Sequence, residues 1–191
     1  MTTGFQPYIV GIGGTARPGS TTEKAVIKAL EAAEQVGAKT KLFGGDFLSK
    51  LPLYNSEHPT RTPEEAELVA AVRAADGIIL GSPAYHGGIT GVVKNAVDLI
   101  EETARDERVY LDGRAVGLIV TAYGWQATGT TLTSMRSIVH ALRGWPTPLG
   151  ATLNATGGLF NEDGSLKEPA VAATLATIGQ QVVQFAVWQK T

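Results

Sequence analysis

The sequence contains no cysteine, and its 191 residues include only three histidines. The lack of cysteine excludes disulfides, thiolate catalysis, zinc–thiolate sites and iron–sulfur clusters. His58, His86 and His140 are too widely spaced along the chain to match a familiar metal-ligand pattern, so we expect no metal site. No G-x-S-x-G segment occurs either, which removes the nucleophile elbow of a Ser-His-Asp hydrolase.

An excess of charge of one sign is also missing, because the formal net charge is −2. Without a broad basic field we expect no nucleic-acid partner. No apolar run approaches the about 20 residues of a membrane helix, and the first residues do not resemble a signal peptide, so we expect no membrane partner. The composition, 43% apolar and 18% charged, is typical of a globular protein. We expect one domain over residues 1–191, located in the cytoplasm.

What the chain does contain is an alternation of short apolar runs and segments with helical periodicity. Strands are expected at 8–14, 38–45, 77–83, 114–124 and 147–158, and helices at 21–37, 62–77, 90–104, 131–146 and 168–189. This alternation predicts an α/β fold with a parallel sheet covered by helices on both faces. Glu101, Glu102 and the segment 104–114 are expected to be solvent-exposed. Ligands of such sheets bind beyond the carboxyl ends of the strands, so the loops after strands one, three and four are the informative ones.

The first of these loops is "GIGGTARPGSTT", residues 11–22. Pro18 and Gly19 make a helix unlikely to begin before Ser20. Ser20 and Glu23 have the spacing of a capping box, which places the helix start at Ser20. The loop is therefore longer than a dinucleotide-binding turn, and it lacks the Gly-Lys-Ser/Thr of a P-loop.

A loop of this composition can hold a terminal phosphate group. Thr15, Ser20, Thr21 and Thr22 offer hydroxyls, and the helix start offers unpaired backbone N–H groups at the positive end of the helix dipole. Arg17 adds a forked cationic donor that suits phosphate. The alternative is that a single hydroxyl caps the helix and Arg17 is a solvated surface charge.

The spacing Thr15-x-Arg17-x-Gly19-Ser20-x-Thr22 after a first strand resembles the NADPH-dependent FMN reductase family. The resemblance implies a flavodoxin-like three-layer sandwich with a five-stranded parallel sheet in the order 2-1-3-4-5. In that family this loop binds the phosphate of FMN. The phosphate-binding residues implied here are Thr15, Arg17, Ser20, Thr21 and Thr22.

The second loop carries the strongest part of the resemblance. The family has a Pro-x-Tyr segment at the end of a strand, then small residues and a helix with Lys-Asn, and this chain has "PAYHGG" followed by Lys94-Asn95. Small residues let the backbone approach a flat isoalloxazine ring, and an aromatic side chain offers it a flat face. The ring-binding residues implied here are Pro83, Ala84, Tyr85, His86 and Gly87. Tyr85 could instead fill the core or contact a subunit, and His86 could be merely exposed.

The third loop follows the fourth strand. The family has small residues there, whose backbone lies along the pyrimidine edge of the flavin, and Thr121, Ala122, Tyr123 and Gly124 fall at those positions. Tyr123 and Trp125 are larger than is common. They either shape the nicotinamide or acceptor site or pack against a partner subunit, and the sequence leaves both open.

The resemblance implies an oxidoreductase that transfers hydride from NADPH or NADH to FMN and passes electrons to a small-molecule acceptor such as a flavin or a quinone. Because the cofactor supplies the chemistry, we expect no catalytic acid–base side chain. A quinone or azo reductase with tightly held FMN, or a flavodoxin-like electron carrier, are the alternatives. The long first loop argues against a Rossmann dehydrogenase. The resemblance also implies a homodimer or homotetramer, with residues 91–104 and the apolar segment "VVQFAVWQ" as candidate contacts.

Overall fold

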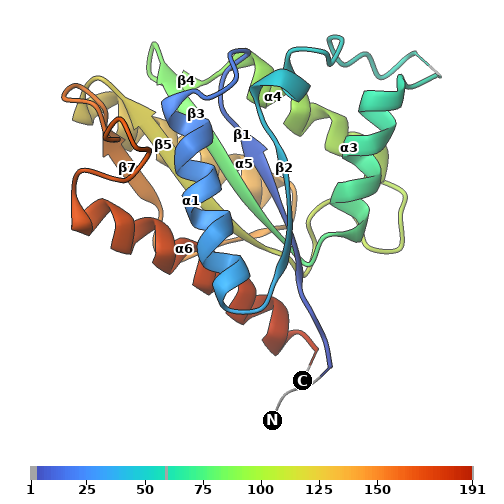
Figure 1. Cartoon of the computed structure of the whole chain (residues 1–191). Coiled ribbons are helices and arrows are strands. Elements are labelled where there is room, and N and C mark those ends of the chain that lie inside the picture. The colour runs from blue at the N-terminus through green and yellow to red at the C-terminus, as the bar shows by residue number, and fades with distance from the viewer. Residues whose placement is uncertain (1–3, 59, 191) are drawn as a thin grey trace.

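The computed structural model describes residues 4–58 and 60–190, and it confirms the alternation of strands and helices (Figure 1). The strands are β1 (Tyr8–Gly13), β2 (Lys39–Phe43), β3 (Gly77–Tyr85), β4 (Gly88–Ile89), β5 (Ala115–Ala122), β6 (Trp145–Pro146) and β7 (Ala151–Asn154). The helices are α1 (Thr21–Gln35), α2 (Gly45–Leu48), α3 (Pro63–Ala74), α4 (Gly91–Asp98), α5 (Trp125–Ala141) and α6 (Pro169–Trp188), with a 3-10 helix η1 (Leu99–Thr103) directly after α4.

The sheet has the expected class and order but more strands than predicted. Its described strands run β2-β1-β3-β5, with β6 and β7 both pairing with β5, and all these pairs are parallel. The predicted fifth strand, residues 147–158, is a strand only at β7, and β6 lies at residues 145–146, which were predicted to end the fourth helix. That helix, α5, already ends at Ala141, and Arg143 has a φ of +61°, which is not helical. The short strand β4 adds an antiparallel hairpin to β3. The expectation of five strands is therefore wrong, whereas the α/β sandwich holds.

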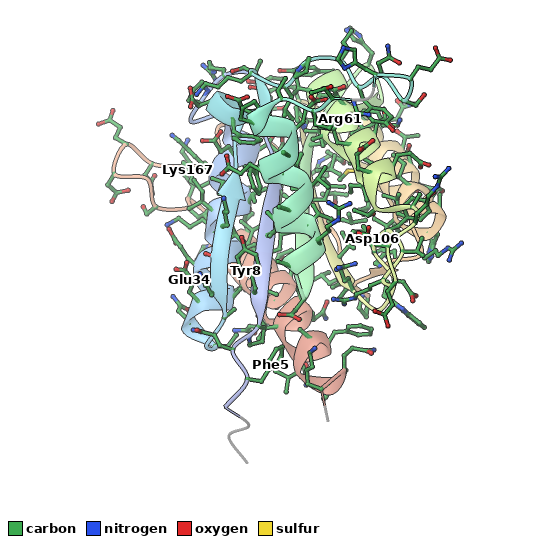
Figure 2. The ribbon with its side chains drawn as sticks, turned by 90° about the vertical axis from the view of Figure 1, so that its right-hand side faces the viewer. Phe5, Tyr8, Glu34, Arg61, Asp106 and Lys167 are labelled. Atoms are coloured by element: carbon green, nitrogen blue, oxygen red, sulfur yellow. The ribbon has the colours of Figure 1, made fainter. Side chains whose placement is uncertain are left out.

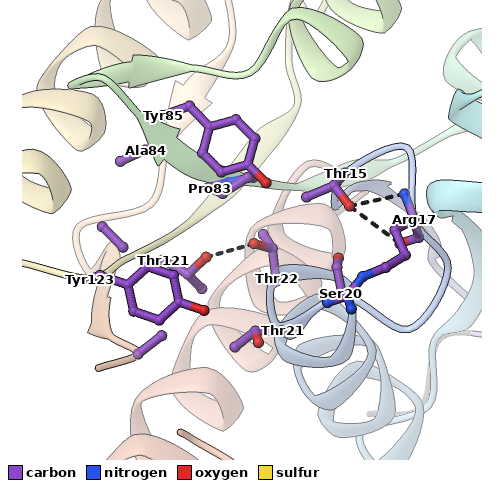
Figure 3. A pocket seen from close by; sticks show the side chains of 12 residues that line it. Thr15, Arg17, Ser20, Thr21, Thr22, Pro83, Ala84, Tyr85, Thr121 and Tyr123 are labelled. Carbon is purple, nitrogen blue, oxygen red and sulfur yellow. Dashed lines mark hydrogen bonds between the residues drawn. The ribbon is translucent and has the colours of Figure 1, made fainter. Parts of the chain in front are cut away.

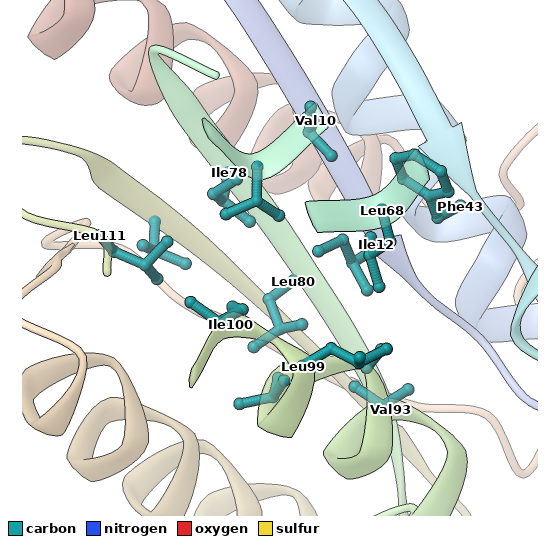
Figure 4. Packing of buried hydrophobic residues seen from close by; sticks show 14 of the residues in the cluster. Val10, Ile12, Phe43, Leu68, Ile78, Leu80, Val93, Leu99, Ile100 and Leu111 are labelled. Carbon is teal, nitrogen blue, oxygen red and sulfur yellow. The ribbon is translucent and has the colours of Figure 1, made fainter. Parts of the chain in front are cut away.

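Helices cover both faces of this sheet. Alternate residues of β3 point to opposite faces: Ile78 and Leu80 pack with α3, η1 and α5, and Ile79 packs with α1 and α6. Figure 4 shows Ile78 and Leu80 in the first of these clusters, with Leu99 and Ile100 of η1 beside them. Because both faces of the central strands are buried, the open carboxyl edge of the sheet is left for a ligand.

Helix α5 begins six residues earlier than the sequence predicts, at Trp125 instead of residue 131. Gly124 occupies the N-cap position, and Gly129 lies within the helix on its exposed side. A glycine on an exposed helix face lowers helix stability without ending the helix. Only Thr121–Gly124 of the predicted third loop therefore remains outside the helix.

Helix α6 is long and apolar enough to cross a membrane by length and composition, contrary to the expectation that no segment would be. Its residues Ile178, Val182 and Val183 are buried against α1 and the sheet. A core helix passes such a test because packing on both a sheet and a neighbouring helix demands a wide apolar surface. One such helix among the described residues is weak evidence for a membrane span.

The segment 104–114 and Glu102 are less exposed than expected. Arg114 is 1% exposed, and its guanidinium donates to the carbonyl oxygens of Arg73, Ala75 and Tyr110 at 2.6–2.9 Å. This burial lowers the pKa of Arg114 to about 10. Its cation sits at the C-terminal end of α3, where the helix dipole favours positive charge.

Glu102 accepts a hydrogen bond from Arg61 Nη2 at 2.8 Å, so it is not a freely solvated charge. Arg61 and Asp106 lie on the side of the molecule that carries α3 (Figure 2). Asp106 accepts from Arg73 of α3 at 2.7 Å. These contacts join the segment before α3 and the end of α3 to η1 and the turn that follows it.

Candidate functional site

The loops after β1, β3 and β5 meet at the carboxyl edge of the sheet and enclose a cavity of about 120 Å³ (Figure 3). The residues that line it are Thr15, Arg17, Ser20, Thr21, Thr22, Pro83, Ala84, Tyr85, Thr121, Ala122, Tyr123 and Ala155. All of these except Ala155 belong to the set that the sequence singled out.

An open groove of about 740 Å³ adjoins this cavity and shares Tyr85 and Tyr123 with it. The remaining predicted residues, His86, Gly87 and Gly124, line the groove. The structure therefore brings every sequence-predicted residue to one place. Their role in holding FMN stays a prediction, which rests on whether the chemistry of the site fits that molecule.

Two of the four predicted phosphate-binding hydroxyls already have backbone partners in the first loop. Thr15 Oγ1 accepts from the N–H of Arg17 at 3.0 Å, and Ser20 Oγ accepts from the N–H of Glu23 at 3.2 Å. The first bond closes a local turn, and the second caps α1. These two hydroxyls therefore stabilise the conformation of the loop, and the backbone N–H groups of Arg17 and Glu23 already occupy them as acceptors.

A third hydroxyl joins the first loop to the third. Thr22 Oγ1 and Thr121 Oγ1 lie 2.6 Å apart in a hydrogen bond, and the two residues are 1% and 4% exposed. The bond connects the first turn of α1 to the end of β5, ninety-nine residues later in the sequence. It holds together two of the elements that line the cavity.

The donors that remain belong to residues that line the cavity. The backbone N–H groups of Ser20, Thr21 and Thr22 have no acceptor among the described residues, and neither does the hydroxyl of Thr21. Arg17 is exposed, and its guanidinium makes no hydrogen bond or ion pair within the described part of the chain. Free N–H groups at a helix start, with a free cation beside them, fit a phosphate group.

Two tyrosines stand at the opposite end of the cavity from Arg17 (Figure 3). Tyr85 ends β3 and is 59% exposed, and Tyr123 follows β5 and is 83% exposed. Pro83 and Ala84 are buried and leave little side chain between the strands and the cavity. Small buried residues beside exposed rings fit a flat heteroaromatic molecule, which needs close backbone approach and apolar packing.

The hairpin of β3 and β4 accounts for His86 and Gly87. Their φ angles are +53° and +83°, and Tyr85 pairs with Gly88 across them. Two successive residues with positive φ are characteristic of a type I′ turn, in which glycine is favoured at the second position. His86 is exposed at the tip of this turn. The sequence reasoning did not predict the hairpin, although "HGG" between apolar residues is a signal for it.

The sequence reasoning also missed residues of the site. Ala155 lines the cavity and directly follows β7, which pairs with β5. Its position near the end of a predicted strand could have indicated that it lies at the carboxyl edge of the sheet. Gln126, Ala127 and Thr130 of α5 line the groove and were missed because that helix was predicted to begin later.

Lys94 and Asn95, which formed part of the resemblance, do not line the site. Asn95 accepts from the N–H of Tyr54 and donates to the carbonyl of Pro52, both at 2.8 Å, and Lys94 pairs with Asp98. Asn95 therefore anchors the segment that precedes α3. Its role is structural, because it fixes a chain segment away from the cavity.

The strand order, the helices on both faces and a cavity at the carboxyl edge place the protein in the flavodoxin-like class. A solved flavoenzyme described as an NAD(P)H:acceptor oxidoreductase, from Paracoccus denitrificans, has the same fold. It superposes with a TM-score of 0.72 at 18% identity, covering 96% of this chain and 97% of its own.

The family follows from the sequence. The model of the NADPH-dependent FMN reductase family matches residues 7–157, and the chain belongs to this family. It is 32% identical over 124 residues to an NADPH azoreductase of Bacillus sp. (strain OY1-2), covering 64% of this chain and 65% of the relative. It is 31% identical over 125 residues to an FMN-dependent NADPH-azoreductase of Staphylococcus aureus, covering 62% and 63%. The resemblance noted in the sequence is thereby confirmed.

Proposed function

We propose that the protein is an NAD(P)H-dependent FMN reductase that passes electrons to a small-molecule acceptor. One observation carries this proposal. The Arg17 guanidinium and the backbone N–H groups of Ser20, Thr21 and Thr22 have no protein partners among the described residues and belong to residues that line the cavity. Exposed tyrosine rings flank the end of the cavity opposite Arg17. This polarity matches a molecule with a phosphate at one end and a flat ring at the other.

FMN, when bound, supplies the hydride-accepting chemistry. The residues of this chain would hold it. Arg17 and the N–H groups of Ser20, Thr21 and Thr22 would bind the phosphate, and the backbone around Ala84 would lie along the ring. Residues 121–124 would line the pyrimidine edge. The open groove beside Tyr85 and Tyr123 would admit a nicotinamide and then an acceptor, because it is continuous with the cavity.

The second candidate is an azo or quinone reductase that keeps FMN bound between turnovers. The names of the two relatives, both azoreductases, favour it. The two candidates share the site and differ in whether FMN leaves as product. Turnover of NADPH or NADH with free FMN, compared with turnover with an azo dye or a quinone, separates them.

The test begins with FMN binding. Titration with FMN and with riboflavin, followed by flavin fluorescence, should show that FMN binds more tightly, since only FMN carries the phosphate. Equal affinities would contradict the proposal. The FMN-loaded protein should then oxidise NADPH or NADH, and a loaded protein that oxidises neither would instead be an electron carrier.

We further propose that the protein acts in the cytoplasm as a homodimer or homotetramer, and that residues 1–191 form one domain. Both hydrophobic clusters pack on the same sheet, which supports a single domain. Trp145 of β6 is 59% exposed and lies 5.9 Å from the Phe185 ring of α6, so "VVQFAVWQ" has an aromatic neighbour at the surface. Sedimentation equilibrium would give the assembly size.

A further inference from the structure

Helices α1 and α3 begin with the same pair of residue types but use them differently. In both, the N-cap hydroxyl accepts from a glutamate N–H three residues later: Ser20 from Glu23, and Thr62 from Glu65. In α3 the carboxylate of Glu65 returns to the N–H of Thr62 at 2.7 Å and completes a capping box. In α1 this return bond is absent, so the capping box expected from the sequence forms only by half.

The carboxylate of Glu23 is directed elsewhere. Oε1 accepts from the N–H of Gly19 at 3.0 Å, and Oε2 accepts from the N–H of Gly45 at 2.6 Å. Glu23 is 9% exposed, so both bonds lie largely out of solvent. The N–H of Ser20, which a complete capping box would occupy, is left without an acceptor among the described residues. It belongs to a residue that lines the cavity.

The turn between β2 and α2 lies directly behind the first loop. A Cβ on Gly45 would come within 2.6 Å of the backbone carbonyl of Arg17, and one on Gly44 within 2.7 Å of Glu23 Oε2. Real Cβ atoms do not approach backbone so closely, so residue 45 needs glycine, whereas a side chain at residue 44 would displace the Glu23 carboxylate. The turn thus packs against the backbone of the loop that carries Arg17, and the Glu23 carboxylate bonds to both segments.

We propose that Glu23 is a positioning residue for the phosphate cradle. Its carboxylate ties the first loop to the turn at residues 44–45, and by doing so it leaves the N–H of Ser20 for the anion. This inference rests on the proposed function, because the anion is taken to be the phosphate of FMN. Glu23 touches neither the phosphate nor the ring and acts through the backbone that it holds.

The first experiment replaces Glu23 by glutamine and measures affinity for FMN and for riboflavin. A glutamine side chain can accept from one backbone N–H but presents an N–H donor to the other, so one of the two ties is lost. We expect FMN affinity to fall by about tenfold, the size of one mismatched hydrogen bond in a buried site, with riboflavin affinity unchanged. Glu65→Gln is the matched control, because it breaks the equivalent helix cap away from the cavity. It should lower the unfolding temperature and leave the FMN-to-riboflavin affinity ratio intact.

The second experiment needs no variant, so it does not depend on Glu23→Gln folding. In the wild-type protein the amide resonances of residues 19–22 and 45 are followed while FMN or riboflavin is added. FMN should shift the Ser20 amide strongly and the Gly19 and Gly45 amides weakly, since Glu23 holds the latter two. Riboflavin should leave the Ser20 amide where it was.

The outcomes separate the inference from the proposed function. If the wild-type protein prefers FMN but Glu23→Gln keeps or increases that preference, the role of Glu23 is overturned and the FMN site stands. If the Ser20 amide resonance does not shift when FMN is added, or if the Gly19 amide resonance shifts most, the role of Glu23 is also overturned. If the wild-type protein binds FMN no better than riboflavin, both proposals fail together.

Discussion

At the scale of single residues, Arg17 differs from Arg61, Arg73 and Arg114 in the contacts that its guanidinium makes. Arg61, Arg73 and Arg114 all donate to carboxylate or carbonyl oxygens. Arg17 is exposed and has no partner among the described residues. Because Arg17 has no protein partner to give up, it can bind an anion without breaking a contact of the fold, and its removal should leave the fold unaffected.

We therefore expect Arg17→Ala to weaken FMN binding by about 1–3 kcal/mol, the range of a hydrogen bond to a charged group. The unfolding temperature should not change. Isothermal titration with FMN and thermal unfolding measure the two quantities. Arg105→Ala is the control, because Arg105 is also exposed and also makes no bond within the described residues. An Arg17→Ala protein with wild-type FMN affinity would mean that this side chain is only surface charge.

The hydroxyls of the first loop show what residue types alone could not reveal. The sequence indicated that Thr15, Ser20, Thr21 and Thr22 were concentrated for a reason, and all four line the cavity. It could not show that Thr22 is bonded to Thr121, because that contact joins segments ninety-nine residues apart. Short-range turn chemistry is visible in a sequence, whereas the partner of a buried hydroxyl depends on packing.

At the scale of elements, the β3–β4 hairpin places Tyr85 beside the groove through a two-residue turn. Gly87 has φ +83°, and an added Cβ there would meet nothing within 4 Å. Gly88 next to it is equally open but is not in the left-handed region. Because neither added Cβ would meet another atom, a comparison of the two positions measures the cost of the left-handed backbone at residue 87 alone.

We expect Gly87→Ala to destabilise the protein by about 1 kcal/mol, because a Cβ is disfavoured at positive φ. Gly88→Ala should be nearly neutral. Urea unfolding measures both. Equal effects of the two substitutions would show that the turn has no left-handed requirement at residue 87.

The contact between Arg61 and Glu102 joins the segment before α3 to η1 and should make stability depend on pH. The hydrogen bond from Arg61 lowers the pKa of Glu102 from its ordinary value of 4.5. A carboxyl group whose pKa is lower in the folded state stabilises the fold above its unfolded pKa, and this contribution is lost as pH falls through the lowered value.

Glu102→Gln should accordingly reduce the free energy of unfolding by about 0.5–1 kcal/mol at neutral pH, since the pair is partly solvated. The difference from wild type should vanish once the pH is well below 4.5. Urea unfolding at several pH values measures this. Glu107→Gln serves as the control because Glu107 is exposed and makes no bond among the described residues. A loss that is the same at every pH would rule out the charge of Glu102 as its cause.

At the scale of the whole molecule, α1 and α6 cross closely on one face of the sheet. Gly179 of α6 lies at the crossing, where an added Cβ would be 2.2 Å from the carbonyl oxygen of Ala29. This contact lets α6 approach α1, whose N-terminal turn carries the proposed phosphate site at the other end of the helix. The contact between α1 and α6 therefore has no room for a side chain at residue 179.

We expect Gly179→Ala to destabilise the protein by about 1–3 kcal/mol, the usual cost of overpacking, despite the higher helix propensity of alanine. Gly129→Ala in α5 provides the contrast, because that glycine is exposed and nothing lies within 4 Å of its added Cβ. It should stabilise the protein by about 0.5–1 kcal/mol through helix propensity. Thermal unfolding of both variants measures these effects, and a stabilised Gly179→Ala protein would contradict the close crossing.

The sequence by itself determined the alternation of strands and helices and the loops that form the site, and its resemblance to the family implied the order of the sheet. It did so because apolar periodicity and turn residues act locally, and because the three loops keep the residue types of the family. Only the tertiary structure decided that a short strand β6 forms at residues 145–146, that α5 starts at Trp125, and that Glu23 bonds to Gly19 and Gly45 instead of closing a capping box. Each of these depends on where a distant segment packs, and the free energy of such packing is absent from any local stretch of residues.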